Sequence, residues 1–212
     1  MKIGFLNASP KLRNSASGVL LTDLKECVLK EIKDAEVTDI NLHKPEVSEE
    51  TIELIKNMDI LVFSFPLYVD GLPSHFLSCL CQLQRLDFGQ KSIGVYGIAN
   101  CGFYEGKQNE CALHILENWC SRMQFQWKMG LGVGGGGSLS MMGSVPFGHG
   151  PKKPIDVKLE QMVQSIKNGF TEENQYVSVG MPRFAYKLAA ELGWKQTIRA
   201  NGGKIRDLGR RL

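Results

Sequence analysis

Residues 59–65 read DILVFSF, a nearly unbroken run of apolar residues that ends at Pro66. A run of this length and composition is typical of a strand buried on both faces, as in the middle of a parallel sheet. Further strand-like runs alternate with segments whose apolar residues recur at helical spacing, and they cover 2–7, 36–40, 92–98 and 125–133. Strands that alternate with helices predict a parallel, doubly wound sheet.

The helical segments and the chain length set the expected architecture. Helical spacing covers 20–32, 49–57, 75–84, 109–123, 155–169 and 182–200. Five strands within about 170 residues have the size of a flavodoxin-like fold rather than of a larger dinucleotide-binding fold. We therefore predict an α/β protein, a three-layer sandwich around a five-stranded parallel sheet in the order 2-1-3-4-5. It occupies residues 1–170, and residues 171–212 form a C-terminal helical extension.

Composition places the chain among soluble globular proteins. It has 212 residues, of which 43% are hydrophobic and 22% are charged, and no apolar stretch is long enough to span a bilayer. The apolar run at the N-terminus is too short for a signal peptide and continues into a strand pattern, so we expect a cytosolic protein. The six cysteines include no C-x-x-C pair, and His75 with Cys79 supplies only two ligands, so no metal site is expected.

Charge is unevenly distributed along the chain. The net charge is +3, yet residues 181–212 contain eight Lys or Arg against two acidic residues. A basic tail of this kind binds nucleic acid, an anionic membrane or an acidic partner, or else it is the solvated face of a helix. We favour the solvated face and expect no nucleic-acid partner, and we keep contact of the basic tail with a membrane as the less favoured alternative. Phe184, Leu188 and Leu192 form an apolar stripe, which indicates that this helix packs on its own domain or on a second subunit.

The loop after the first strand is the first candidate site, because ligands of an open parallel sheet bind beyond the carboxyl ends of its strands. This loop, NASPKLRNSAS (7–17), leads into a helix N-terminus, where free N–H groups and the helix dipole favour an anion. One serine would suffice as a helix cap. Three serines and an asparagine favour a phosphate cradle over a simple capped turn. The motif G-x-x-x-x-G-K-[ST] is absent, so no nucleoside triphosphate site is expected.

Two more loops are expected at the same edge of the sheet. PLYVDGLP (66–73) follows the central strand, and its prolines and glycine hold Tyr68 where it either contacts a flat ring or packs within a turn. ANCGFYEG (99–106) follows the fourth strand; its Gly102 permits close backbone approach, or the loop simply caps the next helix. Cys101 is either a redox-sensitive thiol or an inert one, and we favour the latter. The three loops together have the layout of a mononucleotide site, with phosphate on the first and a ring between the other two.

The segments NASPKLRNSAS, FPLYVDGLPSHF and NCGFYEGKQNE resemble matching segments of the NAD(P)H-dependent FMN reductases and quinone reductases of flavodoxin-like fold. The resemblance covers residues 1–170. It implies that the FMN phosphate is held by Ser9, Lys11, Asn14, Ser15 and Ser17. It places along the isoalloxazine ring Pro66, Leu67, Tyr68 and Val69, and at the far edge of the ring Asn100, Cys101, Gly102 and Glu105.

The chain departs from this family in two places. First loops of the family commonly start with Gly where this chain has Asn7 or Ala8, which narrows the approach to the phosphate. Iron–sulfur relatives carry a tight cysteine cluster near the second loop, and Cys79 and Cys81 do not supply one. We therefore expect no iron–sulfur cluster.

A glycine-rich stretch follows the fifth strand. Gly132, Gly134 and Gly137 spell G-x-G-x-x-G, but the dinucleotide fingerprint also requires a helix there, and SLSMMGSVPFGHG is a poor helix opening. We interpret 132–150 either as a flexible loop near the site, serving as a lid or as part of a nicotinamide pocket, or as an ordinary surface loop. His149 is a candidate polar contact within it.

The resemblance implies an FMN-dependent oxidoreductase that accepts hydride from NAD(P)H and reduces a quinone, a nitro or azo compound, or a flavin. The chemistry would belong to the flavin, with no catalytic side chain. No Ser–His–Asp or paired-carboxylate constellation indicates hydrolysis. The alternatives are a flavodoxin-type electron carrier without its own substrate pocket and a fold relative that has lost the flavin. Carriers are usually smaller and acidic, which disfavours the first alternative. The resemblance also implies a homo-oligomer.

Overall fold

The computed structural model describes residues 1–89, 92–139, 142 and 145–206. The chain divides into two compact units, Met1–Gly180 and Met181–Leu212. Four positions of the glycine-rich stretch 132–150, and Arg210 and Arg211 of the basic tail, lie outside the described residues.

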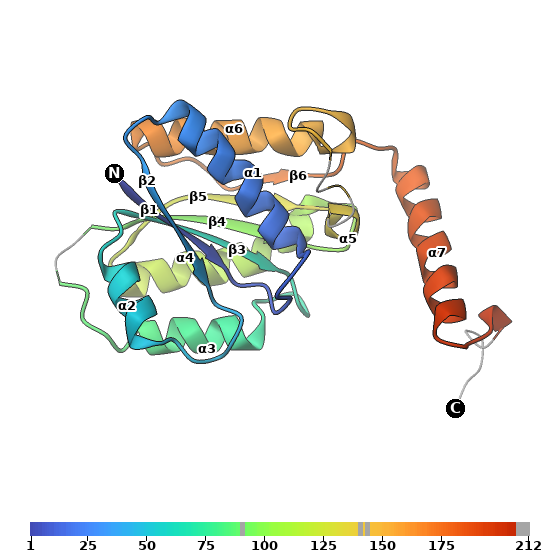
Figure 1. The fold of residues 1–212 in the computed structure, drawn as a ribbon, viewed down its shortest axis with the longest axis horizontal. Coiled ribbons are helices and arrows are strands. Elements are labelled where there is room, and N and C mark those ends of the chain that lie inside the picture. The colour runs from blue at the N-terminus through green and yellow to red at the C-terminus, as the bar shows by residue number, and fades with distance from the viewer. Residues whose placement is uncertain (90–91, 140–141, 143–144, 207–212) are drawn as a thin grey trace. The chain divides into compact units, whose positions relative to one another are not determined.

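A parallel sheet of six strands forms the centre of the first unit (Figure 1). Its order is β2-β1-β3-β4-β5-β6. The strands are β1 (Lys2–Asn7), β2 (Glu36–Asn41), β3 (Ile60–Pro66), β4 (Gly94–Asn100), β5 (Gln126–Val133) and β6 (Gln175–Val177). The first five lie where the sequence predicts strands and in the predicted order, so the α/β class and the doubly wound arrangement are confirmed.

Helices cover both faces of this sheet. Figure 1 shows α1 and α6 on one face and α3 and α4 on the other. The elements are α1 (Ala16–Glu31), α2 (Glu49–Lys56), α3 (Ser74–Leu83), η1 (Gly106–Asn109), α4 (Glu110–Met123), α5 (Gly136–Leu139), η2 (Gly150–Lys152) and α6 (Lys153–Asn168). Five of these helices match the predicted helical segments, and α5 with the two 3-10 turns was not predicted.

The buried run that predicts the fold lies in β3, at the middle of the sheet. Its residues from Leu61 to Phe65 are fully buried. Because side chains alternate along a strand, Phe63 and Phe65 pack with the α3 and α4 layer, where Phe76 lies 5.5 Å from Phe63 and 5.2 Å from Phe65 between ring centroids. Trp119 meets Phe63 edge to face at 5.9 Å.

The prediction of five strands is wrong by one. Gln175–Val177, which lies in the predicted C-terminal extension ahead of its helix, pairs in parallel with Leu131–Val133 of β5. Trp127 supports the approach to this strand, since its indole N–H donates to the side-chain oxygen of Asn174 at 3.0 Å. The strand has three half-buried residues, which is too short for an alternating pattern to be legible.

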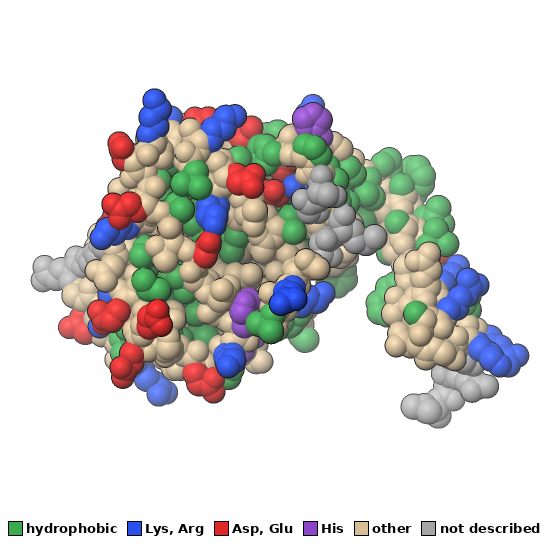
Figure 2. All heavy atoms as spheres, in the orientation of Figure 1, with side chains coloured by type: hydrophobic (Ala, Val, Ile, Leu, Met, Phe, Trp, Pro, Cys, Tyr) green, Lys and Arg blue, Asp and Glu red, His purple; other side chains and the backbone are tan. Residues whose placement is uncertain are grey.

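The second unit contains the predicted C-terminal helix, α7 (Arg183–Ala200). None of its side chains is buried, and Phe184, Leu188, Leu192 and Trp194 are all more than half exposed. Figure 2 shows hydrophobic and basic side chains gathered on it. Across the described residues, no helix combines the length and apolar character needed to cross a membrane.

Candidate functional site

The loops after β1, β3 and β4 meet around one cavity at the carboxyl edge of the sheet. The cavity has a volume of about 200 Å³, and it is lined by Ser9, Lys11, Ser15, Ser17, Pro66, Leu67, Tyr68, Asn100, Cys101 and Gly102, together with Ala16, Gly136 and Gly137. Asn14 lines a neighbouring cavity of about 330 Å³, and Ser15 lines both. Val69 and Glu105 line neither of these two cavities. Ten of the thirteen residues singled out from the sequence therefore surround one space.

The first loop is folded tightly by its own polar side chains. The Ser9 amide donates to the Asn7 side-chain oxygen at 3.1 Å, and the Lys11 amide donates to Ser9 Oγ at 3.2 Å. Ser15 Oγ accepts the Gly18 amide at 3.0 Å and is the N-cap of α1. Because these oxygens already accept hydrogen bonds, the hydroxyl protons of Ser9 and Ser15 are left as donors.

The start of α1 suits an anion. The first amides of a helix have no partner within the helix, and the helix dipole places partial positive charge at this end. The first turn of α1 contains no acidic residue. The three serines of this loop, Ser9, Ser15 and Ser17, are buried. Their hydroxyls are shielded from water, so they indicate a compact polar ligand more strongly than surface serines would.

Asn100 links the three loops. Its side-chain amide donates to Ser17 Oγ at 2.8 Å and to the Phe65 carbonyl at 3.0 Å. Its own carbonyl accepts the Leu67 amide at 2.7 Å. Asn100 is nearly completely buried. Its side chain is thus engaged with the protein itself, and the residue fixes the loops against one another rather than presenting a free amide to the cavity.

The second loop ends in a tight turn between Tyr68 and Gly71. The amide of each donates to the carbonyl of the other at 3.0 Å. The two central residues, Val69 and Asp70, have φ values of 49° and 57°. This is the left-handed region, which a β-branched residue such as valine rarely adopts. The Val69 side chain is fully exposed, and Tyr68, at 46% exposure, is held at the rim of the cavity.

The third loop buries its cysteine. Cys101 is 4% exposed, and Asn109 Nδ2 lies 3.3 Å from its sulfur. Burial raises the pKa of this thiol, which lowers the fraction of reactive thiolate and favours an inert cysteine over a redox-sensitive one. A Cβ atom built on Gly102 would meet no atom within 4 Å, so the space over this residue is open. Glu105 precedes η1 as its N-cap residue.

The glycine-rich stretch forms a fourth wall rather than a dinucleotide fingerprint. A Cβ atom on Gly134 would lie 2.0 Å from the Tyr104 carbonyl oxygen. The Gly136 amide donates to the Cys101 carbonyl at 2.7 Å. These glycines let the chain after β5 pack directly on the third loop, and the helix that follows, α5, has only four residues. Gly136 and Gly137 line the cavity, and a glycine pair at a strand's carboxyl end was the signal that could have placed them there.

Two histidines support the first loop, and no pattern in the sequence indicated either role. His43 Nδ1 lies 2.6 Å from the Ser9 carbonyl oxygen, and His75 Nε2 lies 3.2 Å from the Ala8 carbonyl oxygen. Burial lowers the pKa of His75. The neighbouring Cys79 donates to the Lys44 carbonyl. His149 is exposed, with Nδ1 at 2.8 Å from the Phe147 carbonyl, and lines neither cavity of the site.

No group of three or more His, Cys, Asp or Glu among the described residues is placed to hold a metal ion. The site is therefore built from hydroxyls, backbone amides, glycines and one rim aromatic. Such a set binds an anionic head group and a planar apolar body better than a metal.

Comparison of the sequence with family models and with curated proteins finds no match. Solved structures do match the fold. An FMN-dependent NADH-azoreductase from Bacillus anthracis str. Ames Ancestor, in complex with FMN, matches with a TM-score of 0.52 and 12% identity, over 78% of this chain and 99% of its own. An NAD(P)H:quinone oxidoreductase from Methanothermobacter marburgensis matches with a TM-score of 0.52 and 16% identity, over 79% and 96%.

A flavone reductase matches with a TM-score of 0.61 and 11% identity, over 82% of this chain and 66% of its own. With the strand order described above, these matches show that the first unit has the flavodoxin-like fold.

Proposed function

We propose that the chain is an FMN-dependent oxidoreductase that accepts hydride from NAD(P)H and passes electrons to a small organic acceptor. The observation that carries this proposal is the convergence of the buried serines of the first loop, the rim Tyr68 and the open Gly102 on one cavity. The named activities of the solved structures with the same fold support it, because they include azo-compound, quinone and flavone reduction.

The residues fit a flavin mononucleotide in their chemistry. The phosphate would accept hydrogen bonds from the Ser9, Ser15 and Ser17 hydroxyls and from the first amides of α1, with Lys11 adding positive charge. The ring would lie along Pro66, Leu67 and Tyr68, with Gly102 at its far edge. Bound FMN would supply the hydride and electron transfer.

The protein's own contribution is to hold and orient. Asn100 keeps the first and second loops in register through its bonds to Ser17 and Phe65. Tyr68 is held at the rim by the reciprocal hydrogen bonds of its turn. Burial raises the pKa of the Cys101 thiol, which disfavours a redox role for this residue. We place Asn14, Val69 and Glu105 at the periphery of the FMN site.

The acceptor belongs to the quinones, the nitro or azo compounds or the free flavins. The protein acts in the cytoplasm as a homo-oligomer with no nucleic-acid partner.

Reconstitution with FMN followed by anaerobic NADPH or NADH tests the activity. We expect a yellow protein that bleaches with the nucleotide and regains colour with a soluble quinone or azo dye. A yellow protein that does not bleach would support an electron carrier instead, and a colourless one would support a relative without flavin.

Ser15→Asp separates phosphate binding from folding. Aspartate is as good an N-cap as serine, so α1 keeps its cap, but its charge would face the FMN phosphate. We expect FMN to bind at least about tenfold more weakly, equivalent to about 1.4 kcal/mol. Riboflavin, which lacks the phosphate, is the matched control and should bind equally to both proteins. Equal loss of both ligands would remove Ser15 from the phosphate cradle.

A further inference from the structure

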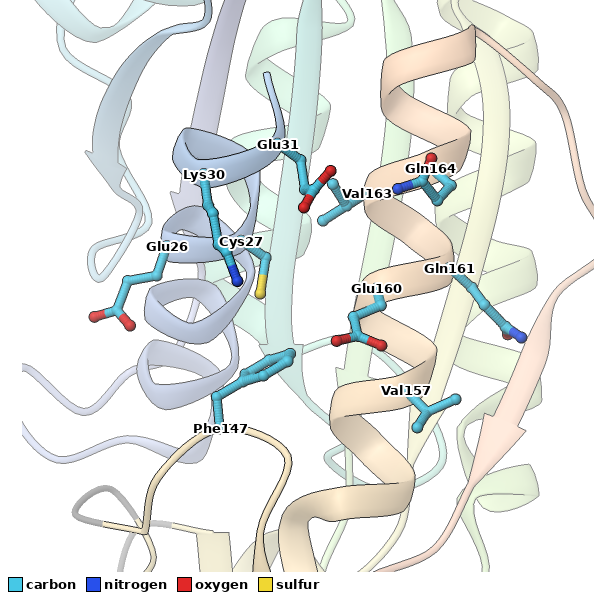
Figure 3. Close-up of a pocket in the computed structure, with 10 residues that line it drawn as sticks. All are labelled: Glu26, Cys27, Lys30, Glu31, Phe147, Val157, Glu160, Gln161, Val163 and Gln164. Atoms are coloured by element: carbon cyan, nitrogen blue, oxygen red, sulfur yellow. The ribbon is translucent and has the colours of Figure 1, made fainter. Parts of the chain in front are cut away.

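A further cavity lies away from the candidate FMN site, between α1 and α6. We call it the α1–α6 groove; its volume is about 560 Å³, and it is lined by Glu26, Cys27, Lys30, Glu31, Phe147, Val157, Glu160, Gln161, Val163 and Gln164. Figure 3 shows Phe147, Cys27 and Glu160 pointing into the space between the two helices. The groove therefore has an apolar floor and charged walls.

The charges of the groove are predominantly negative. Three glutamates and one lysine are among its lining residues. Glu31 lies 3.7 Å from Lys167, whereas Glu26 and Glu160 form no ion pair among the described residues. Burial and, next, the charge of Glu160 raise the pKa of Cys27 to about 11, which agrees with a negative potential inside the groove.

The α7 helix carries the complementary chemistry. Phe184, Leu188 and Leu192 recur every four residues and share one face, and all three are more than half exposed. Lys195 follows three residues after Leu192 on the same face. Lys195 and Arg199 form no ion pair among the described residues. The charges of the two sequence segments differ in the same direction: the excess of basic over acidic residues is confined to residues 181–212 and is absent from residues 1–180.

The dimensions also agree. Groove residues on α6 extend from Val157 to Gln164, which corresponds to about 10 Å along a helix. Leu188 and Leu192 are one helical turn apart, about 6 Å, so both fit within that length together with Lys195. A cluster of apolar anchors in a pocket, surrounded by a polar rim, is a suitable centre for a protein interface.

We propose that α7 of one chain docks into the α1–α6 groove of a second copy, so that the protein dimerises by reciprocal exchange of this helix. Leu188 and Leu192 enter the apolar floor, and Lys195 and Arg199 lie beside Glu160 and Glu26. Pairing of one α7 with another is disfavoured, because both helices carry the same positive charge. The contact does not involve FMN, so it stands or falls independently of the proposed activity.

Sedimentation equilibrium of the full-length chain at micromolar concentrations tests the proposal. We expect a dimer whose dissociation constant rises at high salt, because part of the attraction is electrostatic. Glu26→Lys combined with Glu160→Lys should weaken the dimer by at least about tenfold, and Leu188→Asp combined with Leu192→Asp should do the same. Far-UV circular dichroism and thermal midpoints establish that both variants are folded.

Matched control variants carry the same chemical changes on other exposed positions. Glu36→Lys combined with Glu46→Lys reverses two charges outside the groove, and Leu77→Asp places a charge at an exposed leucine of α3. Both controls should dimerise like the wild-type chain. A wild-type chain that stays monomeric, or a dimer that neither the groove pair nor the α7 pair weakens, would overturn the proposal.

A mixing experiment decides whether the contact is made in trans. The groove variant keeps an intact α7, and the α7 variant keeps an intact groove, so a mixture can form one of the two reciprocal contacts. We expect heterodimers of differently tagged chains in the mixture at concentrations where each variant alone is monomeric. A mixture that remains monomeric contradicts helix exchange. The same result is expected if α7 instead docks on another protein or on a lipid surface.

Discussion

Among single residues, Asn100 shows how a residue that lines the cavity can also hold the loops of the site together. It stands at the end of β4, where the strand order places the third loop beside the first, and its side-chain N–H groups donate to Ser17 and Phe65. Ser17 is drawn into the same arrangement, since its hydroxyl oxygen accepts from Asn100. The family resemblance implied that both contact the ligand; their mutual bond depends on the folded geometry.

Asn100→Ala should therefore destabilise the fold as well as the site. The change leaves the buried Phe65 carbonyl and the Ser17 hydroxyl without their donor, which costs about 1–3 kcal/mol of unfolding free energy. Asn168→Ala is the matched control, because Asn168 makes an equivalent bond to the Gln164 carbonyl on an exposed helix end and should lose less than about 1 kcal/mol. Urea denaturation measures both. Equal losses would show that burial of the Asn100 bonds adds nothing.

At the scale of elements, the loop after β5 takes its shape from what it packs against. Glycines let its backbone lie directly on the third loop, where the Gly135 amide donates to the Phe103 carbonyl at 2.6 Å. The sequence revealed the glycines but not their neighbour. A motif of glycines reports close backbone approach, and only the fold tells whether a nucleotide or another loop makes that approach.

Gly134→Ala tests this packing. The added methyl group would overlap the Tyr104 carbonyl, and because that atom belongs to the backbone, relief requires a shift of the loop. We expect a loss of roughly 1–3 kcal/mol in unfolding free energy. Gly102→Ala adds the same group where no atom lies within 4 Å, and its effect should stay within about 0.5 kcal/mol. A tolerated Gly134→Ala would mean that the two loops do not need this contact.

At the scale of the whole molecule, the parts predicted from sequence were those set by periodicity. The continuous apolar run of β3 and the helical spacing over 20–32 are examples of the patterns that indicated the class, and the order of five strands followed from the flavodoxin-like size. The parts missed were set by tertiary contact. The strand β6 has three residues and exists because β5 offers it an edge, and His43 and His75 reach the first loop from segments distant in sequence.

Buried charge also acts on the stability of the whole first unit. Asp156 Oδ2 accepts the Gly148 amide at 2.7 Å, its other oxygen is buried without a hydrogen-bond partner, and burial raises its pKa above 3.8. Nearby, the buried Lys152 pairs with Asp23 at 2.7 Å, and burial raises the pKa of that carboxyl as well. These groups tie α6 and the segment before it to α1.

The raised pKa gives Asp156 a predictable pH dependence. Asp156 takes up a proton at higher pH in the folded chain than in the unfolded chain. Its contribution to stability is therefore fully present below pH 3.8 and is lost as the pH rises through the folded pKa. Asp156→Asn removes this titration. The unfolding free energy of the wild type relative to the variant should therefore rise as pH falls from 7 toward 3.8, measured by urea denaturation. Parallel profiles for the two proteins would contradict the raised pKa.

The turn between Tyr68 and Gly71 has a consequence for recognition. Two reciprocal bonds hold Val69 and Asp70 in a backbone conformation that valine seldom adopts, so the ordering of this rim is completed when the chain folds. A planar ligand that binds against this turn then contacts a rim that has little conformational freedom left to lose. The entropic penalty of association is correspondingly smaller, and discrimination rests on whether the molecule is thin enough to match a wall that does not adapt.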